Sequence, residues 1–342
     1  MNKLELLKSI EFGESVAELE ADNLSKYFIE THHWQQINDD EVDIVYGTKG
    51  SGKSAIYSLI DQHEPAFFDK NIILKFAEKP RGTTIFSDLQ TSPPASEQSF
   101  IYLWKLYLLS LIGEHFQDFG VQTADGRDVI KALTGSGFIL EKNPLKVFLG
   151  VASNYIKKYF NPTSMEPSLS IGEGSGMVTG VGVKITFNEP SFDLAKTGAQ
   201  SIDTLLHKAN KELEKSGFSL WFLLDRLDVA FADNRTLEEN ALRALFKAYL
   251  DLADYDFIQL KIFLRSDIWQ SITKDGFREA THIRRSTTIE WDRAGLLNLI
   301  VLRLVTNDSI REVYGVTEEA LKMSQYEQQA FFYRVFPRQV DT

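Results

Sequence analysis

The octet GTKGSGKS, residues Gly47 to Ser54, constrains the fold of this chain more than any other feature. It fits the pattern G-x-x-x-x-G-K-[ST] at every fixed position. The apolar run VDIVY precedes it directly, and AIYSLI follows it with spacing typical of a helix. A buried strand before the octet and a helix after it are the context that this pattern requires. The sequence therefore predicts an α/β fold in which the octet is the turn between a strand and a crossover helix.

The residue types in the octet suit the binding of a triphosphate. Gly47, Gly50 and Gly52 allow the backbone to curl so that successive N–H groups converge on phosphate oxygens. Lys53 is the expected first residue of a helix, and the positive end of that helix would face the phosphates. The Lys53 ammonium can reach the β- and γ-phosphates, and the Ser54 hydroxyl is a candidate Mg²⁺ ligand. The predicted nucleotide-binding residues are Gly47, Thr48, Lys49, Gly50, Ser51, Gly52, Lys53 and Ser54. A plain glycine turn is the alternative.

A magnesium-dependent nucleotide site also requires an acid at the end of a buried strand. SLWFLLD is an almost purely apolar run that closes with Asp225, as a strand buried on both faces would. We expect Asp225 to hold Mg²⁺ through its water shell, and Asp228 to orient the attacking water. Ordinary strand-end acids without these roles are the alternative. Arg226 stands where many ATPases carry glutamate, which leaves the hydrolysis rate open.

Strands and helices are predicted to alternate along the rest of the chain. Apolar runs at Asn71–Phe76, Phe257–Leu264 and Thr287–Trp291 are candidate strands. Helical spacing covers residues 201–215 and 237–252. This alternation indicates a parallel sheet with right-handed crossovers.

A long stretch separates the octet from Asp225 and exceeds what a minimal ATPase core needs. It is expected to hold a loop over Lys79–Ser96, a mostly buried helix over Phe100–Phe116 and another helix over Pro144–Tyr159. Ser168–Pro190 is rich in glycine and contains the alternating run VGVKITF, which we interpret as a hairpin with a flexible tip. A disordered loop is the alternative. Insertions of this size commonly carry specific function, so contacts with a partner are expected here.

The order of GTKGSGKS, WFLLDRLD and a buried strand ending in Arg265 resembles the additional-strand P-loop ATPases, especially the AAA+, Cdc6-like and STAND group. The chain is most similar to bacterial ATPases with a KGSGKSA-type loop and a DRLD-type acid motif, some encoded beside phage-defence or DNA-repair genes. The resemblance implies that Arg265 senses the γ-phosphate and that its strand lies between the loop strand and the strand of Asp225. It also implies that the helices after Asp292 form a lid.

In AAA+ relatives, an arginine from one subunit completes the nucleotide site of its neighbour. Arginines cluster near the last predicted strand and the lid, at positions Arg278, Arg284, Arg285, Arg293 and Arg303. The resemblance makes Arg284 and Arg285 the candidates for this role and implies a homo-oligomer. A solvated or acid-paired face is the alternative for each arginine.

The predicted organisation has four parts. These are an N-terminal helical segment (1–40), a P-loop NTPase core (41–80 and 200–291), an insertion of helices with the hairpin (81–199) and a helical lid (292–342). The expected activity is that of an ATPase that binds ATP and Mg²⁺ and acts as a motor or switch on another copy or an effector protein. A role in phage defence or DNA transactions is implied by the resemblance alone.

Composition limits the partners and the compartment. Lys and Arg number 37 against 48 Asp and Glu, and the net charge of −11 gives no general attraction to phosphate backbones, so nucleic-acid binding stays open. The chain has no cysteine, which fits the cytoplasm and excludes thiolate chemistry. The start of the chain lacks the apolar core of a signal peptide. The longest apolar run, Phe100–Ile112, is shorter than the roughly twenty residues of a membrane span, so no membrane partner is expected.

Four other classes compete with an AAA+/STAND ATPase. LSIGE, Leu169 to Glu173, imitates the signature of ABC and SMC-type ATPases, but it lies far from Asp225 and precedes a glycine-rich run. A GTPase would need N/T-K-x-D, and Thr273–Gly276 lacks the final acid. A metabolic kinase fits poorly with the long insertion. An ATP-gated scaffold that hydrolyses little differs from a motor only in turnover.

Overall fold

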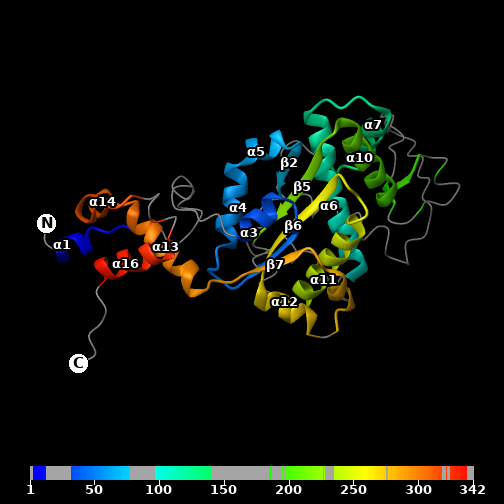
Figure 1. Ribbon diagram of the computed structural model, residues 1–342. Helices are drawn as coiled ribbons and strands as arrows, with labels where there is room; N and C mark the ends of the chain where they lie inside the picture. Colours follow the sequence, from blue (N-terminus) through cyan, green and yellow to red (C-terminus); the bar gives the residue numbers. More distant parts are fainter. Residues whose placement is uncertain are drawn as a thin grey trace, which may run out of the picture. The chain divides into compact units, whose positions relative to one another are not determined.

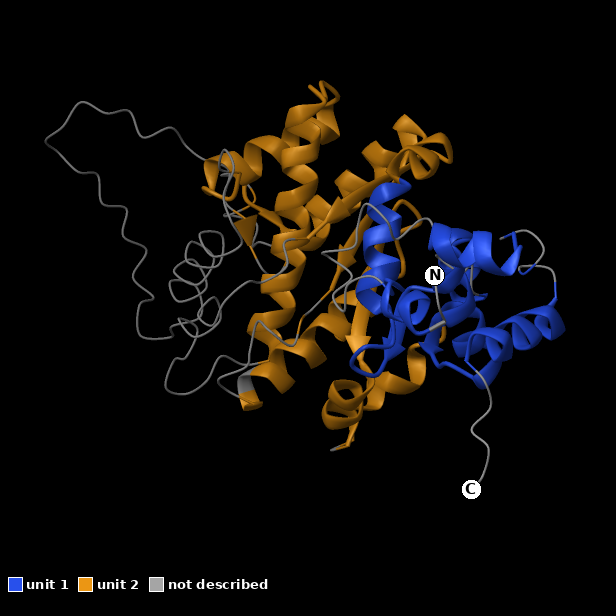
Figure 2. Ribbon diagram, turned by 90° about the vertical axis from the view of Figure 1, so that its left-hand side faces the viewer, with its two compact units in different colours: residues 1–63, 285–342 blue, residues 64–284 orange. Residues whose placement is uncertain are grey.

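The computed structural model describes residues 3–12, 32–77, 97–139, 185–186, 189, 195, 198–225, 227, 235–274, 276–317, 321 and 324–336. The chain divides into two compact units (Figure 2). The first unit comprises residues 1–63 and 285–342, and the second comprises residues 64–284.

A five-stranded sheet runs through the fold in the order β2-β5-β6-β1-β7 (Figure 1). The strands are β1 (Ile44–Gly47), β2 (Ile72–Phe76), β5 (Ser219–Leu224), β6 (Ile258–Arg265) and β7 (Ser286–Ile289). The pairs β1–β7, β2–β5 and β5–β6 are all parallel. The predicted α/β class with a parallel sheet is therefore confirmed. In this order, β6 stands between β1 and β5, as the resemblance implied.

The central strands are apolar because both of their faces are covered. Every residue of β5 from Leu220 onward is buried, and β6 is buried at most of its positions. Burial of such side chains contributes about 1.5–3 kcal/mol each relative to exposure, so these two strands are a main part of the core of the second unit.

Helices of the second unit pack against one another. They are α5 (Glu64–Asp69), α6 (Glu97–Asp118), α7 (Ala124–Gly135), α10 (Ile202–Ser216), α11 (Arg235–Leu252), α12 (Ser266–Thr273) and the 3-10 helix η5 (Arg278–His282). Helix α6 lies along α11, and α7 lies against α10 (Figure 1). Trp104 in α6 donates its indole N–H to the carbonyl of Ala241 in α11 at 2.9 Å. The expected insertion, 81–199, thus contributes α6 to the packed interior of this unit.

Helix α7 was not predicted from the sequence. Its buried side chains, Val129, Ala132 and Leu133, follow helical spacing. Thr123 caps the helix, because its hydroxyl accepts the N–H of Gly126 at 3.1 Å. The capping threonine and this spacing were the available signals.

The first unit contains six described helices. They are α1 (Lys3–Lys8), α3 (His32–Asn38), α4 (Lys53–Gln62), α13 (Arg293–Val305), α14 (Asp308–Tyr314) and α16 (Gln325–Val335). A buried cluster joins α1 to the C-terminal helices through Leu6, Val301, Leu304, Val305, Ile310, Leu321, Phe331 and Val335. The first helix of the expected 1–40 segment is therefore part of one core with helices of the expected lid. Asn307, just before α14, connects the C-terminal helices to the N-terminal segment. Its side chain accepts the N–H of Glu11 at 2.9 Å and donates to the carbonyl of Glu11 at 3.0 Å.

Several predictions for the middle of the chain lie outside the described residues. These are the Lys79–Ser96 loop, the Pro144–Tyr159 helix and most of the Ser168–Pro190 hairpin. Of that hairpin, β3 (Ile185–Thr186) is described, and it pairs in parallel with β4 (Gln200–Ser201). Among the described helices, none has the length and apolar character needed to cross a membrane.

Candidate functional site

The octet forms a tight turn between β1 and α4, which we call the glycine loop (Gly47–Ser54). Gly47 ends β1, and Lys53 is the first residue of α4. Gly50 and Gly52 have φ angles of 81° and 101°, which side chains rarely tolerate. A Cβ added to Gly47 would lie 2.3 Å from Oγ of Ser51, so this position has no room for a side chain. The loop conformation therefore requires glycine at all three positions.

Lys53 is held by the turn that precedes it. Its side chain is buried, with 8% of the residue exposed. Its Nζ donates to the carbonyl oxygens of Gly47 at 2.7 Å and of Thr48 at 2.8 Å. The tip of the loop, Thr48 to Gly50, is exposed. The positive charge of Lys53 thus lies directly behind the exposed residues Thr48 to Gly50, and positive charge at such a place favours the binding of an anion.

Trp291 supports the glycine loop, and sequence reasoning overlooked this residue. It follows β7, and its indole N–H donates to the carbonyl of Ser51 at 2.8 Å. An added Cβ on Gly52 would lie 4.0 Å from its ring, in ordinary contact. The signal in the sequence was a tryptophan at the end of the predicted strand Thr287–Trp291, although nothing there linked it to the octet.

Two predicted site residues lie at the same end of neighbouring strands in the second unit. Asp225 directly follows β5 and is buried, with 4% exposed. Leu224 pairs with Ile262, and β6 ends at Arg265. Because β5 and β6 are parallel, Asp225 and Arg265 are both at the carboxyl-terminal edge, where α/β proteins commonly bind ligands. Asp228, the predicted water-orienting acid, lies outside the described residues.

Arg265 forms a two-point ion pair with Asp267 two residues later. Its Nε and Nη2 bond the two carboxylate oxygens at 3.0 and 2.6 Å. The guanidinium lowers the pKa of Asp267, because these bonds and the positive charge favour the carboxylate. The predicted sensor is thus engaged within its own chain.

Lys261 is a second residue that sequence reasoning overlooked. It lies in the middle of β6 opposite Leu223, and only 1% of it is exposed. Its Nζ lies 4.1 Å from the centroid of the Trp221 ring, which is within the range of a cation–π interaction. The signal was a single lysine inside the otherwise apolar strand IQLKIFLR.

The two arginines proposed to act on a neighbouring subunit differ in their surroundings. Arg284 is exposed. Arg285 is paired within the first unit: its Nε bonds Asp43 at 2.8 Å, and its Nη2 bonds the carboxylate of Asp40 at 2.7 Å. Its carbonyl also accepts the N–H groups of Asp43 and Ile44 at 2.8 and 3.1 Å. Arg285 therefore fastens the start of β1 beside β7, and the role of either arginine in a neighbour's site stays a prediction.

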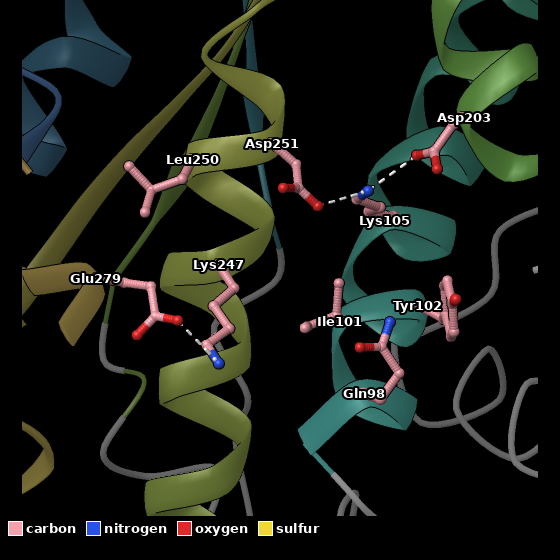
Figure 3. Close-up of a pocket in the computed structure, with 9 residues that line it drawn as sticks. All are labelled: Gln98, Ile101, Tyr102, Lys105, Asp203, Lys247, Leu250, Asp251 and Glu279. Carbon is pink, nitrogen blue, oxygen red and sulfur yellow. Dashed lines mark hydrogen bonds and ion pairs between the residues drawn. The ribbon is translucent and has the colours of Figure 1, made fainter. Parts of the chain in front are cut away.

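The second unit has a cavity of about 390 Å³ between α6 and α11 (Figure 3). Lys105 contributes to it and bonds Asp203 at 2.9 Å and Asp251 at 2.7 Å. Lys247 bonds Glu97 and Glu279 at 2.5 and 3.1 Å. Each lysine is thus matched by two carboxylates, so this cavity is a poorer place for a triphosphate than the glycine loop.

The predicted site residues fall into two groups. All eight residues of the glycine loop, with Trp291, lie in the first unit, whereas Asp225 and Arg265 lie in the second. In the described ranges, no cluster of three or more histidine, aspartate or glutamate side chains could hold a metal ion. The two predicted Mg²⁺ ligands, Ser54 and Asp225, lie one in each unit.

No known protein family matches the chain, and no solved structure matches it. The chain is similar to a putative transposon gamma-delta 80.3 kDa protein of Escherichia coli (strain K12), with 25% identity over 312 residues. The similarity covers 87% of this chain but 40% of that protein. The chain thus spans less than half the length of this relative.

Proposed function

We propose that this chain is a cytoplasmic P-loop ATPase of the AAA+/STAND kind that binds ATP with Mg²⁺, cleaves the β–γ bond with water and thereby controls a partner protein. The glycine loop carries the proposal. Its two left-handed glycines, its crowded Gly47 and its buried lysine are the features that a triphosphate cradle needs.

The sheet and its edge support the same assignment. The place of β6 between β1 and β5 agrees with the one feature of strand order that the resemblance implies. Asp225 and Arg265 stand at the carboxyl-terminal ends of neighbouring strands, as a magnesium acid and a γ-phosphate sensor would. These positions follow from strand pairing rather than from a match to one short motif.

Each residue has a distinct part in the proposed reaction. Lys53 and the loop N–H groups bind the phosphates, while Ser54 and Asp225 hold Mg²⁺. The ion neutralises charge on the β- and γ-phosphates when it is bound. Asp228 orients the attacking water, and Arg265 contacts the γ-phosphate after exchanging its partner Asp267 for the nucleotide. The lid and the 81–199 segment respond to ATP occupancy.

Calorimetry with ATP and Mg²⁺ tests the proposal. Wild type binds ATP, and Lys53→Ala binds it at least tenfold more weakly, because a charged hydrogen bond is worth about 1.5–3 kcal/mol. Asp225→Asn should keep part of the affinity for ATP but should no longer hydrolyse it, so that no inorganic phosphate is released. Lys131→Ala, which removes an exposed lysine from α7, is the control for lost charge. Folded wild-type protein that takes up no nucleotide in the presence of Mg²⁺ would overturn the proposal.

An ATP-gated switch with little turnover is a second candidate. The two-point pairing of Arg265 with Asp267 favours it, because a guanidinium held in this way is withheld from the phosphate. In this case, ATP binds tightly and steady hydrolysis is absent in wild type. Asp267→Asn then raises turnover by releasing Arg265, whereas the change leaves turnover about the same in a motor in which bound ATP already displaces Asp267.

The partner belongs to the proposal as well. The name of the relative associates that protein with a transposon, which supports a role in DNA transactions beside the phage-defence role suggested by the resemblance. We expect another copy or an effector protein as the direct partner, since the chain's net charge of −11 disfavours a general nucleic-acid grip. Light scattering with and without ATP distinguishes a homo-oligomer from a monomer that awaits an effector.

A further inference from the structure

Trp291 occupies the junction between the glycine loop and the first turn of α13. On one side, its indole N–H bonds the carbonyl of Ser51 at 2.8 Å, and its ring lies 4.0 Å from the place of a Cβ on Gly52. On the other side, a Cβ on Gly295 would lie 3.3 Å from the ring. The ring is thus placed between two glycines, one on the loop and one on α13.

Helix α13 is itself fixed at this end. Asp292, the residue after Trp291, caps it by accepting the N–H of Gly295 at 2.7 Å. The carbonyl of Asp292 accepts the N–H of Leu296 at 3.0 Å. Farther along, Val301 and Leu304 belong to the buried cluster of α1, α14 and α16. A shift of the Trp291 ring therefore acts on a helix whose other end is embedded in the helical core.

The loop side is equally confined. Ser51 is buried, and its N–H donates to the carbonyl of Thr48 at 3.2 Å. Gly52 is the residue before α4, and its carbonyl accepts the N–H of Ile56 at 3.0 Å. Ser51 supplies both a loop N–H group and the carbonyl to which Trp291 is bonded, so phosphate that draws the loop N–H groups toward itself acts on the residue that Trp291 contacts.

We propose that Trp291 is a positioning residue that couples occupancy of the glycine loop by the phosphates of a nucleotide to the position of α13. This inference rests on the proposed nucleotide binding. A change in the position of Ser51 moves Trp291 through the indole N–H bond, and a change in the position of Gly52 moves it through contact with the ring. The moved ring then presses on or withdraws from Gly295 in the first turn of α13. The same contact acts in reverse, so a displaced α13 changes the affinity of the loop for nucleotide.

The first arm of the test needs no nucleotide. Hydrogen exchange of the Ile56 amide in ligand-free protein should be faster in Trp291→Phe, which keeps an aromatic ring but lacks the N–H, and faster still in Trp291→Leu. Trp269→Phe, where the ring packs against Phe246 in the second unit at 4.8 Å, is the matched control. Unchanged exchange at Ile56 in both Trp291 variants would overturn the inference whatever the protein binds.

The second arm uses ATP with Mg²⁺. In wild type, saturating ATP should alter exchange of the Leu296 amide, and Trp291→Phe should lose most of that change and bind ATP on the order of fivefold more weakly. If wild type binds ATP and both proteins respond alike at Leu296, the coupling is wrong and the proposed function survives. If wild type binds no ATP, the proposed function and the coupling fail together.

A double-mutant cycle separates coupling from general damage. Gly295→Ala places a methyl against the Trp291 ring from the α13 side without touching the loop. It should change ATP affinity in wild type and have little further effect in Trp291→Leu. Additive effects of the two substitutions would show that the ring does not connect the two turns.

Discussion

At the scale of single residues, the glycine loop depends on free space beside Gly47 as well as on the hydrogen bonds of Lys53 and Trp291. Gly47 is buried at the end of β1, and the nearest neighbour of an added methyl would be Oγ of Ser51. Ser51 is itself buried, and its Cβ would lie 3.2 Å from the added methyl, so rotation of the hydroxyl alone leaves a close contact. A larger residue at position 47 therefore forces Ser51 or the strand end to shift.

Gly47→Ala should destabilise the protein by about 1–3 kcal/mol, as overpacked sites do, and should weaken ATP binding because the loop must open. Urea unfolding and calorimetry measure the two effects. Ser51→Ala removes the atom 2.3 Å from the added methyl, so Gly47→Ala/Ser51→Ala should recover part of the loss. Equal stability of the single and double variants would show that the clash is not the cause.

At the scale of elements, paired charges hold the helices of the second unit together. Lys105 lies in α6 and bonds Asp203 in α10 and Asp251 in α11. Burial opposes its charge, but the two carboxylates outweigh burial and raise its pKa. Its ion pairs are therefore complete below the ordinary lysine pKa and are lost only as pH rises through the raised value.

Lys105→Met should lower the free energy of unfolding by about 1–2 kcal/mol, because two partly exposed carboxylates lose a shared buried cation. Lys247→Met is the matched variant: its side chain also has two carboxylate partners but is 30% exposed against 8% for Lys105. Its loss should stay below about 1 kcal/mol. Similar losses in urea unfolding would contradict the dependence on burial.

At the scale of the whole molecule, a buried histidine limits stability in acid. His115 in α6 has 4% exposure, and its ring centroid lies 4.4 Å from that of Phe119. Burial, assisted by the charge of Lys75 and opposed by that of Asp118, lowers its pKa to about 4. The unfolded chain takes up a proton near pH 6.5 and the folded chain only near 4, so stability falls as pH drops through this window.

The free energy of unfolding should therefore fall by about 2 kcal/mol between pH 7 and pH 5 on account of His115. His115→Phe, which keeps a ring among aromatic neighbours and cannot titrate, should show a correspondingly smaller fall. Urea unfolding at pH 7, 6 and 5 measures both proteins. Parallel pH profiles would mean that other groups cause the acid sensitivity.

Much of the sheet could be predicted because the signals are local. Apolar runs such as Ser219–Leu224 and Ile258–Arg265 bury both faces, and their ends are marked by the charged residues Asp225 and Arg265. Helix α7 was missed because its apolar positions are few and its cap is a single threonine. The pairing of α1 with α13 and α16 could not be predicted, because it joins residues about 300 positions apart through packing alone.

By itself, the sequence determined the glycine loop, since its φ angles and its crowded Gly47 follow from the residue types in one octet. The acid after β5 follows in the same way from an apolar run that ends in a charge. Only the tertiary structure decided that Trp291 bonds Ser51, that Arg285 pairs with Asp43, and that Lys261 is buried over Trp221. Such contacts depend on which strands become neighbours, and strand pairing is decided by the whole chain rather than by any local pattern.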